Sequence, residues 1–249
     1  MTRCERPQVR VFPDLEKLSR DAAVLFSKLA REAIASQGRF VVALSGGSTP
    51  HRMYNLLGST TYRRSIEWKR VHMFWVDERC VPGDHPESNF KLVVETVLSK
   101  VDMPEENIHR IRGEDMPDRA ALDYEQDIRS FFKSTSLPAF DLIILGAGED
   151  GHTASLFPNT AALHEHARLA TPVYLEPPKL NRVTLALSVL NHAVHVLFLA
   201  SGPAKAMVIR EIIENGNPKH YPAGLVHSVR GGVMWYVDKE AASLLTKDH

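Results

Sequence analysis

One stretch in the middle of the chain most strongly limits what it can fold into: residues 140–158, FDLIILGAGEDGHTASLFP. It opens with an unbroken apolar run, residues 142–145, and continues into a loop that contains three glycines. A short apolar run bounded by glycine predicts a strand buried on both faces, which is typical of a parallel sheet covered by helices. Asp150 and His152 follow this strand, and open α/β sheets bind ligands just beyond the carboxyl ends of their strands. We therefore expect the loop to belong to a functional site.

The glycines of this loop, Gly146, Gly148 and Gly151, also match the dinucleotide-binding pattern GxGxxG. That pattern requires a helix running on from its last glycine, whereas Pro158 follows too soon for such a helix. A glycine turn with a purely structural role is the other alternative, because glycine lets a backbone turn sharply. The acid and the histidine that flank the last glycine favour a catalytic loop over both alternatives.

Strand-like and helix-like segments alternate along the 249 residues. Apolar runs predict strands at residues 9–12, 40–44, 71–76, 108–111, 142–145, 169–174, 182–187, 194–200 and 233–237. A helix is predicted from its cap residue Asp14 to the stop signal Gly38, and others at residues 51–57, 89–99, 118–133 and 201–214. This alternation predicts an α/β protein whose mostly parallel sheet is flanked by helices on both faces. The length suits a single domain of residues 1–249, with a possible small extra lobe.

The charge and cysteine content argue against several classes of protein. Lys plus Arg and Asp plus Glu each number 30, and the resulting zero net charge argues against general nucleic-acid or membrane binding. Cys4 and Cys80 are too few for a disulfide framework and indicate a reducing compartment. Neither a secretory signal nor a stretch apolar enough to span a bilayer is visible. We expect a cytoplasmic protein, and its oligomeric state, monomer or dimer, stays open.

Loops that follow predicted strands carry the remaining candidate chemistry. Besides residues 146–153, they are SGGSTP at residues 45–50, the triplet Asp77-Glu78-Arg79, and residues 201–205. The carboxyl ends of parallel strands lie at one edge of a sheet, so these loops can converge on one pocket. SGGSTP combines backbone N–H groups, hydroxyls and a helix start, which suits a phosphate. The simpler alternative is a capped tight turn between a strand and a helix.

Basic side chains near these loops, Arg79, Arg182 and Lys205, could add positive charge around a bound anion. For each of them singly, a solvated surface charge is an equally good interpretation. The histidines within residues 164–166 and 192–195 are too loosely spaced for a metal site, and the sequence contains no CxxC, HExxH or GxSxG. We expect no metal centre, and we expect His72 to be a hydrogen-bonded strand histidine.

The loop sequences form a recognisable set. They are SGGSTP, Asp77-Glu78-Arg79, Ser88-Asn89, GAGEDGHTASLFP, Arg182-Val183-Thr184 and Gly202-Pro203-Ala204-Lys205. Together these strings resemble the 6-phosphogluconolactonase family, and the similarity covers nearly the whole chain, residues 9–236. The string GxGxDGHTASLFP is the most specific of them. The resemblance implies the Rossmann-like fold that this family shares with glucosamine-6-phosphate deaminase, in one α/β domain.

The resemblance also implies an activity: hydrolysis of 6-phospho-D-glucono-1,5-lactone to 6-phospho-D-gluconate in the oxidative pentose phosphate pathway, without a metal or organic cofactor. It implies that His152 is the general base and that Asp150 is a neighbouring carboxylate. A neutral imidazole can take a proton from water near neutral pH, so a reactive lactone needs no covalent nucleophile. The implied substrate- and phosphate-binding residues are Ser45, Gly46, Gly47, Ser48, Thr49, Asp77, Arg79, Asn89, Gly148, Arg182 and Lys205.

Glucosamine-6-phosphate deaminase is the nearest alternative, because it resembles this chain in the phosphate loop, the Asp-Glu pair and the Asp-Gly-His segment. The deaminases carry a glutamate five residues after that histidine, where it assists ring opening, and Phe157 occupies this position here. The departure favours the lactonase. A non-catalytic sugar-phosphate sensor is a further alternative, which the presence of Asp150 and His152 disfavours.

Overall fold

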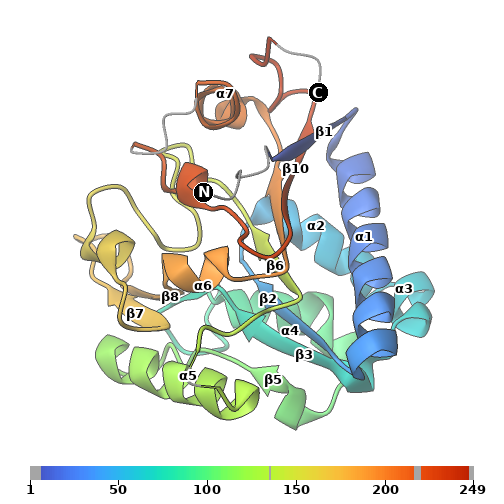
Figure 1. Cartoon of the computed structure of the whole chain (residues 1–249), viewed down its shortest axis with the longest axis vertical. Helices are drawn as coiled ribbons and strands as arrows, with labels where there is room; N and C mark the ends of the chain where they lie inside the picture. The colour runs from blue at the N-terminus through green and yellow to red at the C-terminus, as the bar shows by residue number, and fades with distance from the viewer. Residues whose placement is uncertain (1–6, 135, 216–219, 247–249) are drawn as a thin grey trace.

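The computed structural model describes residues 7–134, 136–215 and 220–246. Its centre is a seven-stranded sheet in which every neighbouring pair of strands is parallel (Figure 1). Across the sheet the strands are β1 (Gln8–Phe12), β10 (Gly232–Asp238), β9 (His195–Ala200), β6 (Leu142–Leu145), β2 (Phe40–Leu44), β3 (Val71–Trp75) and β5 (Ile108–His109). This topology confirms the predicted α/β class with a mostly parallel sheet.

Local sequence explains where the central strands and the first helix begin and end. Strands β2 and β6 are buried along their whole length, as their apolar runs predict. Helix α1 (Leu15–Gln37) starts after Asp14, whose side chain accepts a hydrogen bond from the backbone N–H of Lys17 at 2.8 Å. It ends at Gly38, whose φ of 81° is a left-handed conformation that glycine adopts without strain. Both helix boundaries confirm the sequence prediction.

Helices cover both faces of the parallel sheet, as predicted. Helices α1 and α2 (Ser48–Leu57) lie on one side, whereas α5 (Pro117–Phe132) and α6 (Leu187–Asn191) lie on the other (Figure 1). Further α-helices are α3 (Thr60–Ser65), α4 (Asn89–Thr96) and α7 (Ala206–Ile213). Helices α3 and α6 were not predicted, because such short segments show no clear helical periodicity.

Three predicted helices have other bounds in the structure. The helix predicted over residues 89–99 ends at Thr96, and Leu98–Lys100 forms a 3₁₀ turn. Helix α2 begins at Ser48 rather than at residue 51, so part of SGGSTP forms the first helical turn. Proline is tolerated in a first turn, where its missing N–H costs no hydrogen bond, so Pro50 does not delay the helix. The segment predicted as one helix over residues 201–214 is a 3₁₀ turn, Pro203–Lys205, followed by α7.

A second, smaller sheet corresponds to the small extra lobe that the sequence analysis considered possible. It is three-stranded and antiparallel, with β8 (Arg182–Leu185) between β4 (Asp77–Arg79) and β7 (Ala170–Val173). The prediction that Asp77-Glu78-Arg79 is a loop is therefore wrong. These residues form a strand because β8, far along the chain, supplies the pairing partner. Helix α5 packs against β7 and joins this sheet to the rest of the molecule.

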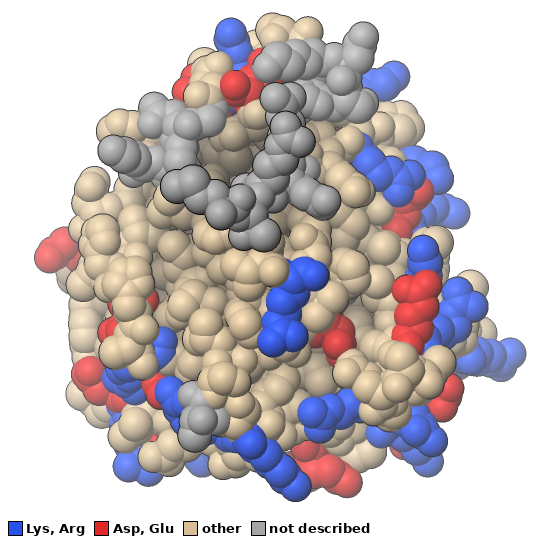
Figure 2. Space-filling model, in the orientation of Figure 1, with Lys and Arg blue, Asp and Glu red and all other residues tan. Residues whose placement is uncertain are grey.

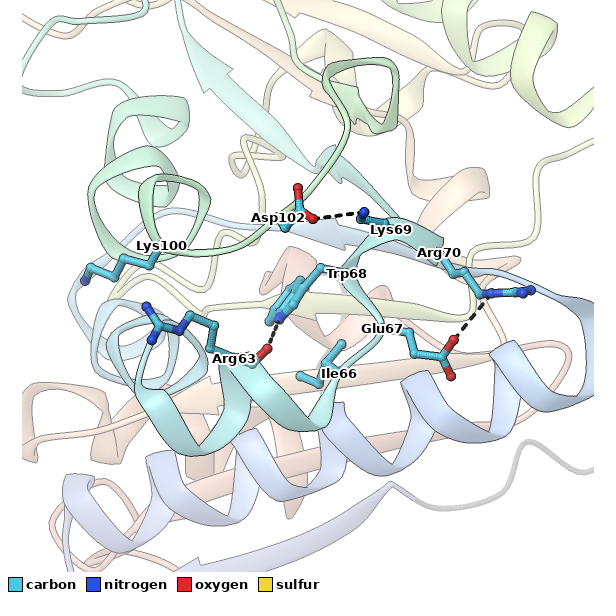
Figure 3. A pocket seen from close by; sticks show the side chains of 8 residues that line it. All are labelled: Arg63, Ile66, Glu67, Trp68, Lys69, Arg70, Lys100 and Asp102. Carbon is cyan, nitrogen blue, oxygen red and sulfur yellow. Dashed lines mark hydrogen bonds and ion pairs between the residues drawn. The ribbon is translucent and has the colours of Figure 1, made fainter.

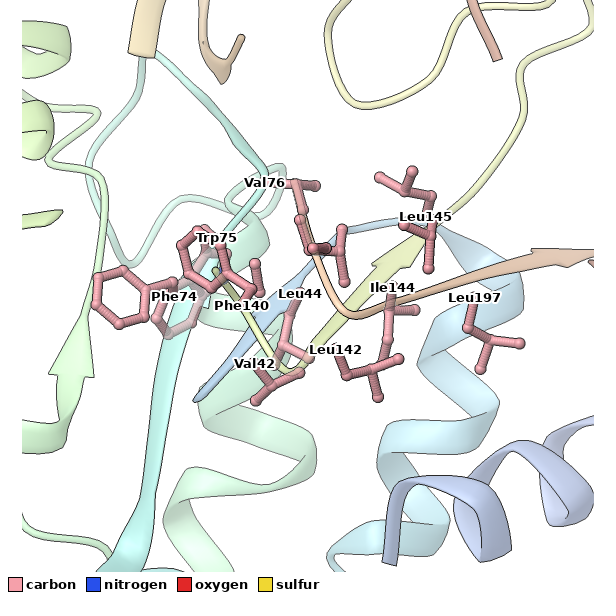
Figure 4. Close-up of a cluster of buried hydrophobic side chains, with 14 of the residues drawn as sticks. Val42, Leu44, Phe74, Trp75, Val76, Phe140, Leu142, Ile144, Leu145 and Leu197 are labelled. Carbon is pink, nitrogen blue, oxygen red and sulfur yellow. The ribbon is translucent and has the colours of Figure 1, made fainter. Parts of the chain in front are cut away.

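A continuous apolar core holds the strands in place. Figure 4 shows its centre, where side chains such as Val42, Trp75 and Leu145 from neighbouring strands meet. Val183 and Leu185 of the small sheet belong to the same cluster. Full burial of one such apolar side chain contributes about 1.5–3 kcal/mol. The core therefore fixes the strand ends from which the candidate functional loops leave.

One half-buried side chain departs from its predicted environment. His72 on β3 packs against Phe131, with 4.6 Å between ring centroids. Its Nδ1 is buried and has no hydrogen-bond partner among the residues that the structure describes, so the prediction of a hydrogen-bonded strand histidine is wrong. Burial, and secondarily the nearby His109, lowers the pKa of His72 to about 4.

The molecular surface mixes charges of both signs. Figure 2 shows basic and acidic side chains interspersed over one face, which agrees with the zero net charge of the chain. Within the described ranges, no helix combines the length and the apolar character needed to cross a membrane.

Candidate active site

A cavity of about 200 Å³ lies at the carboxyl edge of the parallel sheet, between the loops that leave β2, β6 and β9. Every residue predicted to bind substrate or phosphate lines this cavity, together with His152: Ser45, Gly46, Gly47, Ser48, Thr49, Asp77, Arg79, Asn89, Gly148, Arg182 and Lys205. Asp150 does not line it, but lies beside it in contact with His152, with half of its side chain exposed. This is the convergence expected of loops at one edge of a parallel sheet.

Asp150 and His152 form a hydrogen-bonded pair at the edge of the cavity. Nδ1 of His152 lies 2.5 Å from Oδ1 of Asp150, and the backbone N–H of His152 donates to the same oxygen at 3.1 Å. The side-chain hydrogen bond is the main reason that the pKa of Asp150 is lowered to about 2, so its carboxylate is ionised near neutral pH. With Nδ1–H bonded to the carboxylate, Nε2 is the proton acceptor of the ring. The pair is therefore arranged for general base catalysis by His152.

Gly148 provides the space for this pair. A Cβ atom at Gly148 would lie 2.1 Å from Nδ1 of His152 and 2.5 Å from Oδ1 of Asp150, so a larger residue would collide with both side chains. Gly151 turns the chain between them with a φ of 77°. Residues 152–160 form turns rather than a helix, which removes the structural basis of the dinucleotide alternative. The loop glycines shape the catalytic pair instead.

The start of helix α2 presents hydrogen-bond donors to the cavity. Gly47 precedes the helix with a φ of 108°, and no side chain caps the first turn. The Oγ atom of Ser45 is buried and has no hydrogen-bond partner among the described residues. A helix N-terminus combines free N–H groups with the positive end of the helix dipole, so it suits a phosphate.

Arg79 and Arg182 lie directly opposite each other on β4 and β8. Like charges in such cross-strand pairs repel, and the Nε atoms of both arginines are buried without a hydrogen-bond partner in the described part of the chain. Burial, followed by the charge of Arg79, lowers the pKa of Arg182 from its usual value. An anion in the cavity would relieve this repulsion, which supports a role for both side chains in binding one.

Asp77 and Asn89 connect the parts of the site to one another. Oδ2 of Asp77 accepts a hydrogen bond from Ser155 Oγ at 2.6 Å, and its Oδ1 accepts one from Asn89 Nδ2 at 3.3 Å. Asn89 also accepts a hydrogen bond from Arg79 and lies against Gly46, where a Cβ atom would come within 1.8 Å of Asn89 Oδ1. These contacts use both carboxylate oxygens of Asp77, so it is better placed to hold the site together than to take a proton.

Two polar residues beside the cavity, Ser155 and Glu78, were given no individual role by the sequence analysis. Ser155 is fully buried, and the only signal for its role is a hydroxyl between apolar neighbours in the most specific string. The carboxylate of Glu78 is buried and accepts hydrogen bonds from the backbone N–H groups of Asn89 at 2.7 Å and Phe90 at 2.8 Å, so it caps α4. Burial raises the pKa of Glu78, and these hydrogen bonds oppose the shift.

A larger hollow of about 560 Å³ lies elsewhere, around Trp68 at the amino end of β3 (Figure 3). Its charged side chains are partly paired: Lys69 lies 3.0 Å from Asp102, and Arg70 lies 3.4 Å from Glu67. It contains none of the predicted site residues, and strand amino ends are not where open α/β sheets place their chemistry. We therefore assign the candidate active site to the smaller cavity.

Metal binding and disulfide formation were also considered for the described residues. No group of three or more His, Cys, Asp or Glu side chains in the described part of the chain could hold a metal ion. Cys80 is a free, half-buried thiol whose pKa is raised to about 11 by burial. Cys4 lies outside the described residues.

The parallel sheet, the cationic cavity at its carboxyl edge and the histidine–carboxylate pair define an α/β enzyme site for a small anionic substrate. Comparison with known proteins gives the family. Residues 13–235 match the family described as glucosamine-6-phosphate isomerases/6-phosphogluconolactonase, and the chain belongs to this family. The resemblance noted from the loop sequences is thereby confirmed.

The relatives align over almost the whole chain. The 6-phosphogluconolactonase of Synechocystis sp. is 38% identical over 243 residues, which cover 96% of this chain and 98% of that protein. The human 6-phosphogluconolactonase is 37% identical over 241 residues, which cover 96% and 93%. A solved 6-phosphogluconolactonase from Trypanosoma cruzi superposes with a TM-score of 0.87 at 29% identity, covering 97% of this chain and 98% of that one.

Proposed function

We propose that this chain hydrolyses 6-phospho-D-glucono-1,5-lactone to 6-phospho-D-gluconate, a step of the oxidative pentose phosphate pathway. Relatives of nearly the same length carry the name 6-phosphogluconolactonase. The cavity supplies both an anion site and a proton acceptor, which this reaction needs. The observation that carries the proposal is the 2.5 Å contact between Asp150 and His152 beside the cationic cavity.

In the proposed complex the substrate phosphate binds at the N-terminus of α2. Lys205 and the two cavity arginines surround it, and the uncapped helix start donates N–H groups to it. The phosphate is remote from the reacting carbonyl, so its binding energy serves to orient the lactone ring toward His152.

The chemical step starts with general base catalysis. Nε2 of His152 takes a proton from water while the water oxygen forms a bond to C1 of the lactone, and Asp150 stabilises the resulting imidazolium. Backbone N–H groups of the loops donate hydrogen bonds to the tetrahedral oxyanion. The bond from C1 to the ring oxygen then breaks, the imidazolium returns its proton to that oxygen, and the product acid ionises in solution.

Deamination of glucosamine-6-phosphate is the competing activity within the family. Phe157 places its ring centroid 4.4 Å from that of His152. An aromatic hydrocarbon at this point can neither give nor take a proton, so it cannot replace the ring-opening glutamate of the deaminases. The contact therefore favours the lactonase.

A proton-release assay with freshly prepared lactone, run beside glucosamine-6-phosphate, tests the proposal. His152→Asn keeps a polar side chain but removes the proton acceptor, so kcat should fall by roughly 10²–10⁴-fold while product binding persists. His166→Asn, at an exposed histidine away from the cavity, is the matched control. Spontaneous hydrolysis is subtracted from every rate. Near wild-type turnover by a folded His152→Asn protein would contradict the mechanism. If the wild-type protein turned over glucosamine-6-phosphate and not the lactone, its function would be deamination instead.

We also propose a domain organisation, a cellular compartment and a cofactor requirement for this enzyme. We infer a single domain acting in the cytoplasm without a metal or cofactor, on a sugar-phosphate lactone as its partner. The hydrophobic cluster that joins both sheets supports the single domain. The low cysteine content supports a reducing compartment, and a reaction driven by an imidazole and bound water needs no metal.

A further inference from the structure

Several hydrogen bonds converge on one buried carboxylate that does not line the cavity. Asp238, at the end of β10, accepts hydrogen bonds from the hydroxyl of Ser201 and from the backbone N–H of Gly202, at 3.1 Å to Oδ1 and 3.2 Å to Oδ2. It also accepts one from the N–H of Ala241 at 2.8 Å. Its exposed fraction is only 4%. A buried carboxylate satisfied by so many donors fixes the segments that supply them.

Strand register explains why Asp238 meets this turn. Val237 of β10 pairs with Ala200 of β9, so the residues that follow them, Asp238 and Ser201, lie side by side at the carboxyl edge of the sheet. Gly202 then turns the chain with a φ of 93°, a conformation that is strained for other residues. Its carbonyl accepts a hydrogen bond from the backbone N–H of Lys205 at 3.1 Å. The carboxylate of Asp238 is thus connected to Lys205 through one short turn.

We propose that Asp238 is a positioning residue for substrate binding, which acts by holding the Ser201–Lys205 turn so that Lys205 points into the cavity. The inference rests on the proposed function, because it assigns Lys205 to the substrate phosphate. Asp238 itself touches no substrate. Its loss lowers the affinity for phosphorylated ligands and leaves the His152 chemistry intact.

Asp238→Asn is the sharpest variant, because it keeps the size of the side chain. An amide has one acceptor oxygen in place of two, and its NH₂ group would face donors of the turn. We expect KM for the phosphorylated lactone to rise about tenfold, the equivalent of one lost hydrogen bond to a charged group. The kcat value, and the rate with unphosphorylated gluconolactone, should stay near those of the wild type.

A double-mutant cycle separates positioning from a general structural role. If Asp238 acts through Lys205, Asp238→Asn should have no further effect on KM in the Lys205→Ala background. Additive losses, or equal losses with both lactones, would overturn the inference. Asp14→Asn makes the same chemical change at the exposed cap of α1, which does not line the cavity, and should change neither constant.

Two further measurements keep the test decisive. If Asp238→Asn does not fold, Ser201→Ala removes only one of the donors and undergoes the same comparison. Calorimetric titration with 6-phosphogluconate reports binding without turnover, and the affinity should fall about tenfold in the variant. A wild-type protein that does not hydrolyse the lactone would contradict the proposed function. A wild type that does so, beside an Asp238→Asn protein of unchanged KM and affinity, would contradict this inference alone.

Discussion

The imidazole of His152 meets the carboxylate of Asp150 at 2.5 Å, within a loop whose Gly148 leaves room for both side chains. The two residues are separated by a single glycine, so the contact is built almost entirely by the local turn. The distant parts of the chain contribute the cavity into which the pair faces. Four predictions test this division of roles, together with the stability of the fold.

The first prediction concerns Asp150→Asn. Removing the anion beside the imidazole takes away the group that stabilises the imidazolium, so kcat should fall by about tenfold, at the low end for a charge-assisted contact because Asp150 is half-exposed to solvent. The hydrogen bond from His152 lowers the pKa of Asp150 to about 2 in the wild type, so this carboxylate is ionised near neutral pH. Steady-state kinetics near neutral pH measures the loss. An unchanged kcat would show that Asp150 does not act on His152.

The second prediction compares Gly148→Ala with the control variant Gly232→Ala. The added methyl at position 148 would overlap both members of the pair, so kcat should fall by roughly 10²-fold although the protein still folds. A Cβ atom at position 232 would meet nothing within 4 Å, and Gly232 does not line the cavity, so Gly232→Ala should keep near wild-type activity. Circular dichroism shows whether both variants fold, and steady-state kinetics compares their kcat values. Similar activities in the two proteins would contradict the proposed geometry.

The third prediction assigns Lys205 to the phosphate. Lys205 lines the cavity near the N-terminus of α2, where an anion would bind. Lys205→Ala should lower kcat/KM for the phosphorylated lactone by about ten- to a hundredfold, mainly through KM, since a hydrogen bond to a charged group contributes about 1.5–3 kcal/mol. Unphosphorylated gluconolactone should be affected much less. Equal losses with the two substrates would indicate a folding role instead.

The fourth prediction concerns acid stability and His72. Burial lowers the pKa of His72 from 6.5 to about 4, so the unfolded chain takes up this proton first as the pH falls. The free energy of unfolding should therefore decrease between pH 6.5 and about 4, and this destabilisation is absent above pH 6.5. His72→Phe should lose less stability over that range, by about 1–2 kcal/mol after allowance for partial solvent exposure.

Urea unfolding at about pH 7 and about pH 5 measures this difference. His166→Phe, at an exposed histidine, serves as the control and should keep the wild-type pH dependence. If His72→Phe lost as much stability as the wild type on acidification, another buried group would have to be responsible.

Local sequence was sufficient for much of the fold and for the chemical identity of the site. The apolar runs of β2 and β6, the cap at Asp14 and the stop at Gly38 were all predicted where the structure has them. The reason is that burial periodicity and helix capping depend on residues a few positions apart. The convergence of the candidate loops could be predicted for a similar reason, since parallel strands bring their carboxyl-end loops to one edge. The individual substrate-binding candidates were implied by the resemblance to the family.

Only the tertiary structure decided features that depend on distant partners. Asp77-Glu78-Arg79 was predicted to be a loop, and only its pairing with β8 makes it a strand. The hydrogen bonds of Asp77 with Ser155 and Asn89 likewise depend on distant parts of the chain. His72 was predicted to be an ordinary strand histidine, whereas in the structure its ring packs against Phe131. Asp238 carried no sequence signal at all, because its donors come from a neighbouring strand end. The sequence by itself thus determined which chemical groups reach the edge of the sheet. Long-range pairing and burial, which no local pattern encodes, decided which of those groups stay free to act.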